Sequence, residues 1–143
     1  TTLESNTYTF TAADFGFTDL ADSPANLFDS VIITTLPTVG TLYLNGVAVN
    51  ALDVIAVADI PLLTFEPVPN GNGIGYDSFT FQVVDDGGTA DGGADTDATP
   101  RTITIDVSPI NSAPYGTDAT LSILEDGSHS FSAADFGFSD TDD

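Results

Sequence analysis

The chain has 143 residues and a formal net charge of −21, with a single Arg (Arg101), no Lys and no Cys. So acidic a chain is not expected to bind nucleic acid or to insert into an anionic membrane, and without Cys it has neither disulfides nor thiolate metal ligands. An apolar content of 41% argues against disorder of residues 1–110, because disordered segments combine charge with low hydrophobicity.

The predicted elements are short strands with period-two alternation of apolar residues. Tyr8 and Phe10 alternate within residues 7–11, and a single helical turn is expected from Ala12 to Phe15. Strands follow at residues 31–35, 41–49, 62–66, 77–84 and 101–108, while residues 54–60 are ambiguous between strand and turn. Asn45-Gly46 predicts a hairpin within 41–49, because this dipeptide favours two-residue hairpin turns. About seven strands between Pro-marked breaks predict an all-β sandwich.

Two groups of aromatic and aliphatic residues are expected inside that sandwich. The first alternates along the last two strands and comprises Phe79, Phe81, Ile103, Ile105 and Val107. Inward-facing apolar residues of this kind form the core of a sandwich. The second consists of Phe15 and Phe17, which bracket Gly16 and are expected to form a plug near one pole.

The sequence also repeats itself. Residues 1–22 return as residues 122–143 at a fixed offset of 121, with eleven identical positions, including all of ADFGF. A fixed period is typical of a tandem array. We expect one complete repeat at 1–110, a Pro-containing linker at 111–114, and the first strands of the next, incomplete repeat at 115–143.

Several segments resemble one known family, the cadherin-like tandem repeats of large bacterial surface adhesins of the RTX type, secreted by the type I route. These segments are LEDG at 124–127, ADFGF followed by acids, ITTLPTVGTLYLNGVAV, FEPVPNGNGIGYDSFTFQVVDDGG and the PINSAP linker. The resemblance implies a seven-stranded Ig-like, cadherin-like Greek-key β-sandwich. It also implies an extracellular protein of the bacterial cell surface that binds Ca²⁺ where neighbouring repeats of the same polypeptide meet.

Strand directions predict which acids meet at such a junction. Because alternate strands run in opposite directions, the turn that holds Glu4 and the loop from Asn70 to Asp77 are expected beside the linker. Calcium takes about six to eight oxygen ligands, so two repeats would share it. The expected ligand set is Glu4, Asp77, Asn111, Asp140 and Asp142.

A second group of acids is expected at the other pole. It comprises Asp19, Asp22, Asp85 and Asp86, and Glu125 is the counterpart of Glu4 in the second copy. We include all of these among the candidate Ca²⁺ ligands, with solvated turns as the alternative. The loop 85–97 has the Asp and Gly content of a calcium loop but lacks EF-hand spacing. The alternative interpretation of this loop is that it is mobile and binds no metal.

The function expected from these features is that of a calcium-stiffened spacer supporting cell adhesion or biofilm formation. The alternative is a module that itself binds a glycan or protein ligand. Catalysis is not expected, because His129 is the only histidine and a hydrolytic triad needs a base beside a nucleophile. Residues 115–143 are left with three possibilities: disorder, docking on their own repeat, or strand exchange with another copy of the chain.

Overall fold

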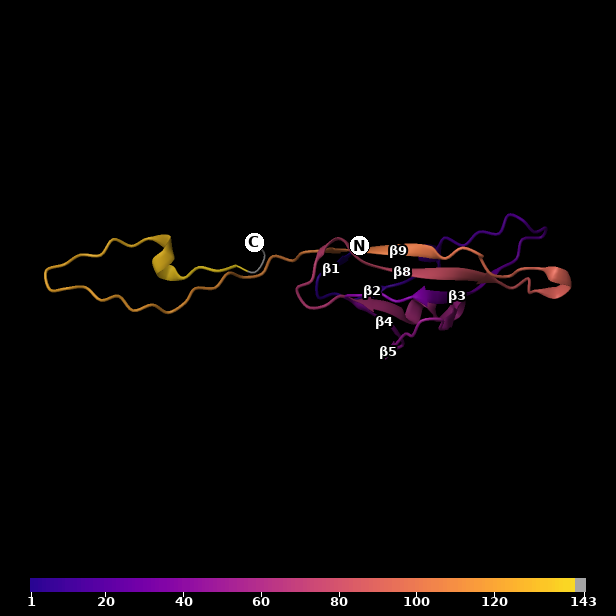
Figure 1. Ribbon diagram of the computed structural model, residues 1–143, viewed down its shortest axis with the longest axis horizontal. Helices are drawn as coiled ribbons and strands as arrows, with labels where there is room; N and C mark the ends of the chain where they lie inside the picture. The colour runs from indigo at the N-terminus through magenta and orange to yellow at the C-terminus, as the bar shows by residue number, and fades with distance from the viewer. Residues whose placement is uncertain (141–143) are drawn as a thin grey trace. The chain divides into compact units, whose positions relative to one another are not determined.

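The computed structural model describes residues 1–140. The chain divides into two compact units, Thr1–Pro109 and Ile110–Asp143. The first unit is a sandwich of two sheets (Figure 1), which confirms the predicted all-β sandwich. One sheet has the strand order β1-β9-β8-β3-β6, and the other has the order β2-β7-β4-β5. In chain order the strands are Thr2–Leu3 (β1), Tyr8–Thr9 (β2), Phe28–Thr35 (β3), Thr41–Leu44 (β4), Val47–Ala48 (β5), Val54–Ala56 (β6), Leu63–Glu66 (β7), Gly73–Asp85 (β8) and Arg101–Ser108 (β9).

The opening of the chain contributes to both sheets. β1 pairs in parallel with β9, with Thr2 opposite Val107 and Leu3 opposite Ser108. A tight turn follows, in which Ser5 has a positive φ of 59° and the amide of Asn6 donates to the carbonyl of Leu3. The chain then enters the second sheet as β2, which pairs antiparallel with β7. The sequence predicted a strand near β2 but not the parallel pairing of β1.

The hairpin predicted at Asn45-Gly46 is confirmed. Asn45 and Gly46 both have positive φ, 49° and 78°, and join β4 to β5 with Tyr43 opposite Ala48. Residues 54–60, for which the sequence left strand and turn open, contain both. The strand β6 occupies Val54–Ala56, and a 3-10 helix, η2, follows at Val57–Leu62.

The core lies between the two sheets and is rich in aromatic residues. Phe79 and Phe81 are buried as predicted, and so are Ile105 and Val107, whereas Ile103 is half-buried. Phe10 contacts Phe79 edge-on with ring centroids 5.7 Å apart. Edge-to-face ring pairs add about 0.5–1.5 kcal/mol to the effect of burial alone.

The predicted plug is confirmed for Phe15. This residue ends a 3-10 turn, η1 (Ala12–Phe15), is buried, and packs edge-on against Phe81 with centroids 4.9 Å apart. Phe17 is half-buried and stacks on Phe28, with an interplanar angle of 8°. The two rings therefore close the sandwich where β3 begins and β8 ends.

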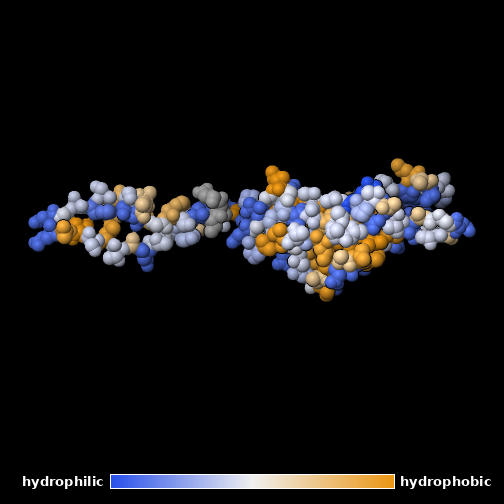
Figure 2. All heavy atoms as spheres, in the orientation of Figure 1, coloured by the Kyte–Doolittle hydropathy of each residue, from blue (hydrophilic) through white to orange (hydrophobic). Residues whose placement is uncertain are grey.

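Some apolar surface remains on the first unit. Figure 2 shows it gathered on the side that carries β4 and β5, where Val47 and Leu62 are exposed. Within residues 1–140, no helix has the length and apolar character needed to cross a membrane.

The second unit repeats two turns of residues 2–17 but not the strands β1 and β2. A 3-10 helix, η4 (Ala133–Phe136), corresponds to η1, and each is preceded by a capping box: Thr11 with Asp14 in the first copy, Ser132 with Asp135 in the second. Tyr8 donates to Asp14 at 3.0 Å, and at the corresponding position His129 Nε2 lies 3.3 Å from Asp135.

The two copies differ in burial. Phe10 is 1% exposed, whereas its counterpart Phe131 is 67% exposed, and Phe136 is exposed where Phe15 is buried. The backbone of the second unit is joined by hydrogen bonds between Tyr115 and Ser139, and its only helix within the described part is η4. The second copy thus has the opening turns of a repeat without its core.

Candidate metal sites

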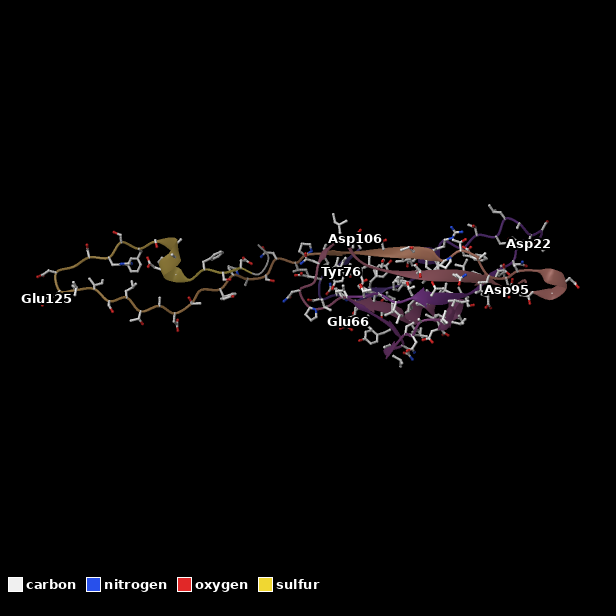
Figure 3. All side chains as sticks on the ribbon, viewed as in Figure 1. Asp22, Glu66, Tyr76, Asp95, Asp106 and Glu125 are labelled. Carbon is white, nitrogen blue, oxygen red and sulfur yellow. The ribbon has the colours of Figure 1, made fainter. Side chains whose placement is uncertain are left out.

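The end of the first unit where β9 finishes at Ser108 is called the exit end here. Glu4, in the turn after β1, lies there because its amide donates to the carbonyl of Ser108 at 2.8 Å. Asp77 is close by on β8, opposite Ile105 of β9. The structure therefore brings Glu4 and Asp77 to one end of the sandwich, the end marked in Figure 3 by Asp106 and Tyr76.

Glu4 is a buried carboxylate, with 4% of its surface exposed. Asn72 donates its side-chain amide to Glu4 Oε2 at 2.9 Å. Neither of the two ion pairs found within residues 1–140 involves Glu4. The chain's only Lys or Arg is Arg101, which lies at the other end of β9, roughly 23 Å away along the strand. Glu4 is thus a buried carboxyl group that accepts a hydrogen bond from Asn72 and has no cationic side chain beside it.

Asp77 has a different role, that of a loop anchor. It is 6% exposed, and its two oxygens accept the backbone amides of Thr38, Val39, Gly40 and Ser78 at 2.8–3.0 Å. Burial alone raises the pKa of Asp77, but these four hydrogen bonds outweigh it, so the pKa is lowered. The carboxylate therefore stays ionised and fixes residues 38–40 against β8.

The anchoring role of Asp77 was missed from the sequence, although a signal was present. Asp77 has the same parity in its strand as Phe79 and Phe81, both predicted to face the core. An acidic residue on the inward face of a strand needs hydrogen-bond donors, because a buried charge without partners is costly.

A third carboxylate also organises the exit end. Asp106 of β9 accepts the backbone amide of Gly75 at 2.7 Å and so holds the start of β8, where the pairing with β9 is irregular between Gly73 and Asp77. Asp106 was not among the predicted ligands. Together with Glu4 and Asn72 it makes this end rich in carboxylate and amide oxygens.

The acids predicted for the opposite pole do gather there, around Asn26 and Leu27. Asp19 accepts the amide of Asn26 at 2.7 Å, and Asp22 accepts the side chain of Asn26 at 3.0 Å. Asp86 accepts the amide of Leu27 at 2.7 Å. The hydrogen bond from Asn26 is the main cause of the lowered pKa of Asp19. These carboxylates shape the loops between β2 and β3.

Asp85 ends β8 and accepts the amide of Gly87 at 2.7 Å. The two groups of acids are far apart, because Asp77 and Asp85 are eight residues apart on β8, or about 27 Å. Figure 3 marks this opposite end with Asp22 and Asp95. Each end of the sandwich thus has its own set of carboxylates.

The acidic loop after β8 is held by backbone hydrogen bonds. The amide of Asp85 donates to Asp95, and the amide of Asp97 donates to Val83, at 2.8 and 3.0 Å. Asp97 also pairs with Arg101 at 2.7 Å, the main cause of its lowered pKa. Beside this loop lies a cleft of about 480 Å³, whose lining includes Asp19, Asp85, Asp95, Asp97 and Arg101.

The remaining predicted ligands belong to the second unit. Asn111 donates its side chain to the carbonyl of Ser112 at 3.0 Å, and Glu125 lies in an exposed turn equivalent to that of Glu4. Asp140 is the last described residue, and Asp142 lies outside the described residues. The two units are described separately, so a shared site formed by Glu4, Asp77, Asn111, Asp140 and Asp142 stays a prediction.

The side chains at the exit end bear oxygen atoms, the ligand type that hard cations such as calcium bind. In this structure the NH₂ group of Asn72, and not its oxygen, faces Glu4 Oε2. Within residues 1–140, no three acidic or histidine side chains converge closely enough to hold a metal by themselves. Glu4 and Asn72 by themselves therefore do not make a metal site.

Comparisons with known proteins leave the function to be argued from these residues. No protein family, curated protein or solved structure matches this chain.

Proposed function

We propose that this chain is a calcium-stiffened extender repeat of a large secreted bacterial adhesin. Its place would be outside the cell, on the bacterial surface, where an array of such repeats supports adhesion or biofilm formation. We assign its sandwich to the Ig-like, cadherin-like Greek-key type. That assignment is supported by the parallel pairing of β1 with β9 and by the passage of the chain from one sheet to the other between β1 and β2.

The observation that carries the proposal is the buried carboxylate of Glu4. A buried charge is normally paired or bound to a metal, and this one has no Lys or Arg within reach. Glu4 lies at the exit end, next to the last residue of β9, where a linker to the next repeat would begin. A divalent cation there would supply the missing positive charge.

The distribution of the other acids supports a stiffening role. Carboxylates lie at both ends of the sandwich, so the facing ends of two successive repeats would both be negative. Like charges at such short range repel one another, and a cation bound between them would replace repulsion by shared coordination. Calcium would then convert a flexible string of repeats into a stiff one, with the neighbouring repeats of the same polypeptide as partners.

The test measures thermal unfolding with and without calcium for the wild-type chain and for Glu4→Gln. In chelator, Glu4→Gln should be at least as stable as wild type, because it removes an uncompensated buried charge. In calcium the order should reverse, because only wild type gains binding energy, about 2.7 kcal/mol at a concentration 100-fold above the Kd.

Asp59→Asn is the matched control, because it removes the same charge from an exposed residue of η2. It should respond to calcium like wild type. The proposal fails if millimolar calcium leaves the melting temperature of wild type unchanged, or if Glu4→Gln gains as much from calcium as wild type does.

A second candidate function is that of a ligand-binding module. The cleft beside the acidic loop favours it, because it combines the chain's only Arg with several carboxylates. A glycan or protein ligand held there should bind less tightly to Arg101→Gln. Such a loss together with an unchanged calcium response of Glu4→Gln would favour this function over the spacer.

A further inference from the structure

The chain has three Asn-Gly pairs, at residues 45–46, 70–71 and 72–73. In such a pair the backbone nitrogen of the glycine can attack the side-chain amide carbon of the asparagine, because glycine has no side chain to shield its nitrogen and its backbone turns freely. The attack closes a five-membered succinimide ring and releases ammonia. Which pair reacts depends on how the fold holds the glycine nitrogen and the leaving amide.

Two of the three pairs are held against this reaction. The amide of Gly71 donates to the carbonyl of Val68 at 3.0 Å, so attack by this nitrogen would first have to break a hydrogen bond. Asn45 and Gly46 form the turn of a hairpin, and the pairing of β4 with β5 fixes both of them. The fold therefore leaves residues 45–46 and 70–71 little freedom to close the ring.

The pair at 72–73 has more room. Asn72 precedes β8 and is exposed, so water can reach it. A Cβ placed on Gly73 would meet nothing within 4 Å. The pairing of β8 with β9 is also irregular between Gly73 and Asp77. The backbone here can therefore adjust so that Gly73 N approaches the side chain of Asn72.

The nitrogen that would leave Asn72 faces a buried carboxylate. Asn72 Nδ2 donates to Glu4 Oε2 at 2.9 Å, and Glu4 is only 4% exposed. As the ring closes, the leaving nitrogen takes up a proton and becomes positively charged before it departs. A negative group that is already in place stabilises a charge that develops in the transition state. Glu4 thus favours the loss of ammonia from Asn72.

We propose that Asn72 is a self-modification site, at which the chain converts this asparagine to aspartate or isoaspartate with Glu4 as the catalytic residue. The bond from Gly73 N to Asn72 Cγ forms, and the bond from Cγ to Nδ2 breaks. Water takes the proton of Gly73 N and supplies the proton that ammonia carries away. A second water molecule then opens the ring at either carbonyl group. The chain loses NH₃ and gains H₂O, and nothing is oxidised or reduced.

The reaction happens once in each chain and needs no metal, so it is independent of the proposed function. Its product changes the exit end, because an oxygen replaces the nitrogen that donates to Glu4. A hydrogen bond becomes a contact between two carboxylates, which repel each other. In chelator, Asn72→Asp should therefore melt about 4–8 °C below the wild-type chain. Equal melting temperatures would refute this effect of the modification.

Peptide mapping by mass spectrometry tests the reaction itself. The wild-type chain is incubated at neutral pH in chelator, and a protease that cleaves after aromatic residues then releases residues 66–76, which contain Asn70 and Asn72. Asn72 should be converted about ten times faster than Asn70 or Asn45, because only its pair is free to react. In urea the three rates should become similar. Equal rates in the folded chain would overturn the proposal.

Glu4→Gln tests the role of the carboxylate, because Gln keeps the shape of Glu4 without its charge. Conversion of Asn72 should slow about tenfold or more, whereas conversion of Asn45 should not change. The matched control is Glu66→Gln, which removes the same charge from an exposed residue of β7 and should leave the rate at Asn72 unaltered. If Asn72 reacts as fast in Glu4→Gln as in wild type, Glu4 is not the catalytic residue.

Discussion

Replacing Asp77 by Asn measures how strongly one carboxylate holds the exit end together. The two oxygens of Asp77 accept four backbone amides, from Thr38, Val39, Gly40 and Ser78, at 2.8–3.0 Å. Asn has one oxygen and one NH₂ group, so whichever way it is turned, two of these amides face a donor. Asp77→Asn therefore keeps the shape of the side chain but removes half of its acceptors.

The expected cost follows from these contacts. A hydrogen bond to a charged group contributes about 1.5–3 kcal/mol, and a buried donor left unsatisfied costs about 1–3 kcal/mol. Since the contributions are not additive, we expect Asp77→Asn to lower the free energy of unfolding by about 3–5 kcal/mol in total. That is a large part of the 5–15 kcal/mol typical of a folded domain.

The assay is urea unfolding followed by circular dichroism, in chelator, so that any metal-binding role of Asp77 does not contribute. Asp106→Asn is the control: Asp106 accepts one amide, that of Gly75, which the amide oxygen of Asn can still accept, so the loss should be about 1 kcal/mol or less. A loss below about 1 kcal/mol for Asp77→Asn would refute the reasoning, because the loop would then be held by other contacts.

Three further changes test the fold. The pKa of Asp77 is lowered in the folded protein, so its stabilising effect is present above the unfolded pKa of about 3.9 and disappears as pH falls through the lower, folded pKa. The stability difference between wild type and Asp77→Asn, measured from urea midpoints, should therefore shrink below about pH 4. A stability difference that grows below this pH would contradict the expectation. Gly40→Ala should cost about 1–3 kcal/mol in the same assay, because its new Cβ would overlap the ring of the buried Phe65; a neutral result would mean that this ring moves freely. Phe10→Ala should cost about 3–5 kcal/mol, whereas Phe131→Ala at the equivalent, exposed position should change stability by less than about 0.5 kcal/mol; similar losses would show that the second copy has a core of its own.

The sequence predicted most of the first unit because its signals are local. The alternation of Phe79 and Phe81 identified an inward strand face, and Asn45-Gly46 identified a hairpin, since both depend on residues that are neighbours in the chain. For the acids of the first unit the pole was also predictable, because it follows from counting strand directions. Strand boundaries were less accurate: β3 and β8 begin three and four residues earlier than expected.

What the sequence did not reveal depends on contacts between distant residues. The hydrogen bond from Asn72 to Glu4 joins positions 68 residues apart. Asp77 on β8 accepts the amides of residues 38–40, which lie in the loop between β3 and β4. No periodicity identifies such partners. The sequence therefore placed Glu4 and Asp77 at the same end but could not distinguish a buried charge without a cation from one satisfied by four amides.

The matching turns η1 and η4 have a consequence for how each repeat is built. Their capping hydrogen bonds join residues three positions apart, and η4 has the same form although Phe131 and Phe136 are exposed. Contacts this close in the chain form far sooner than pairings between remote strands. In every repeat the capped 3-10 turn would thus form early in folding. The later strands would then assemble next to a segment that already has its native conformation.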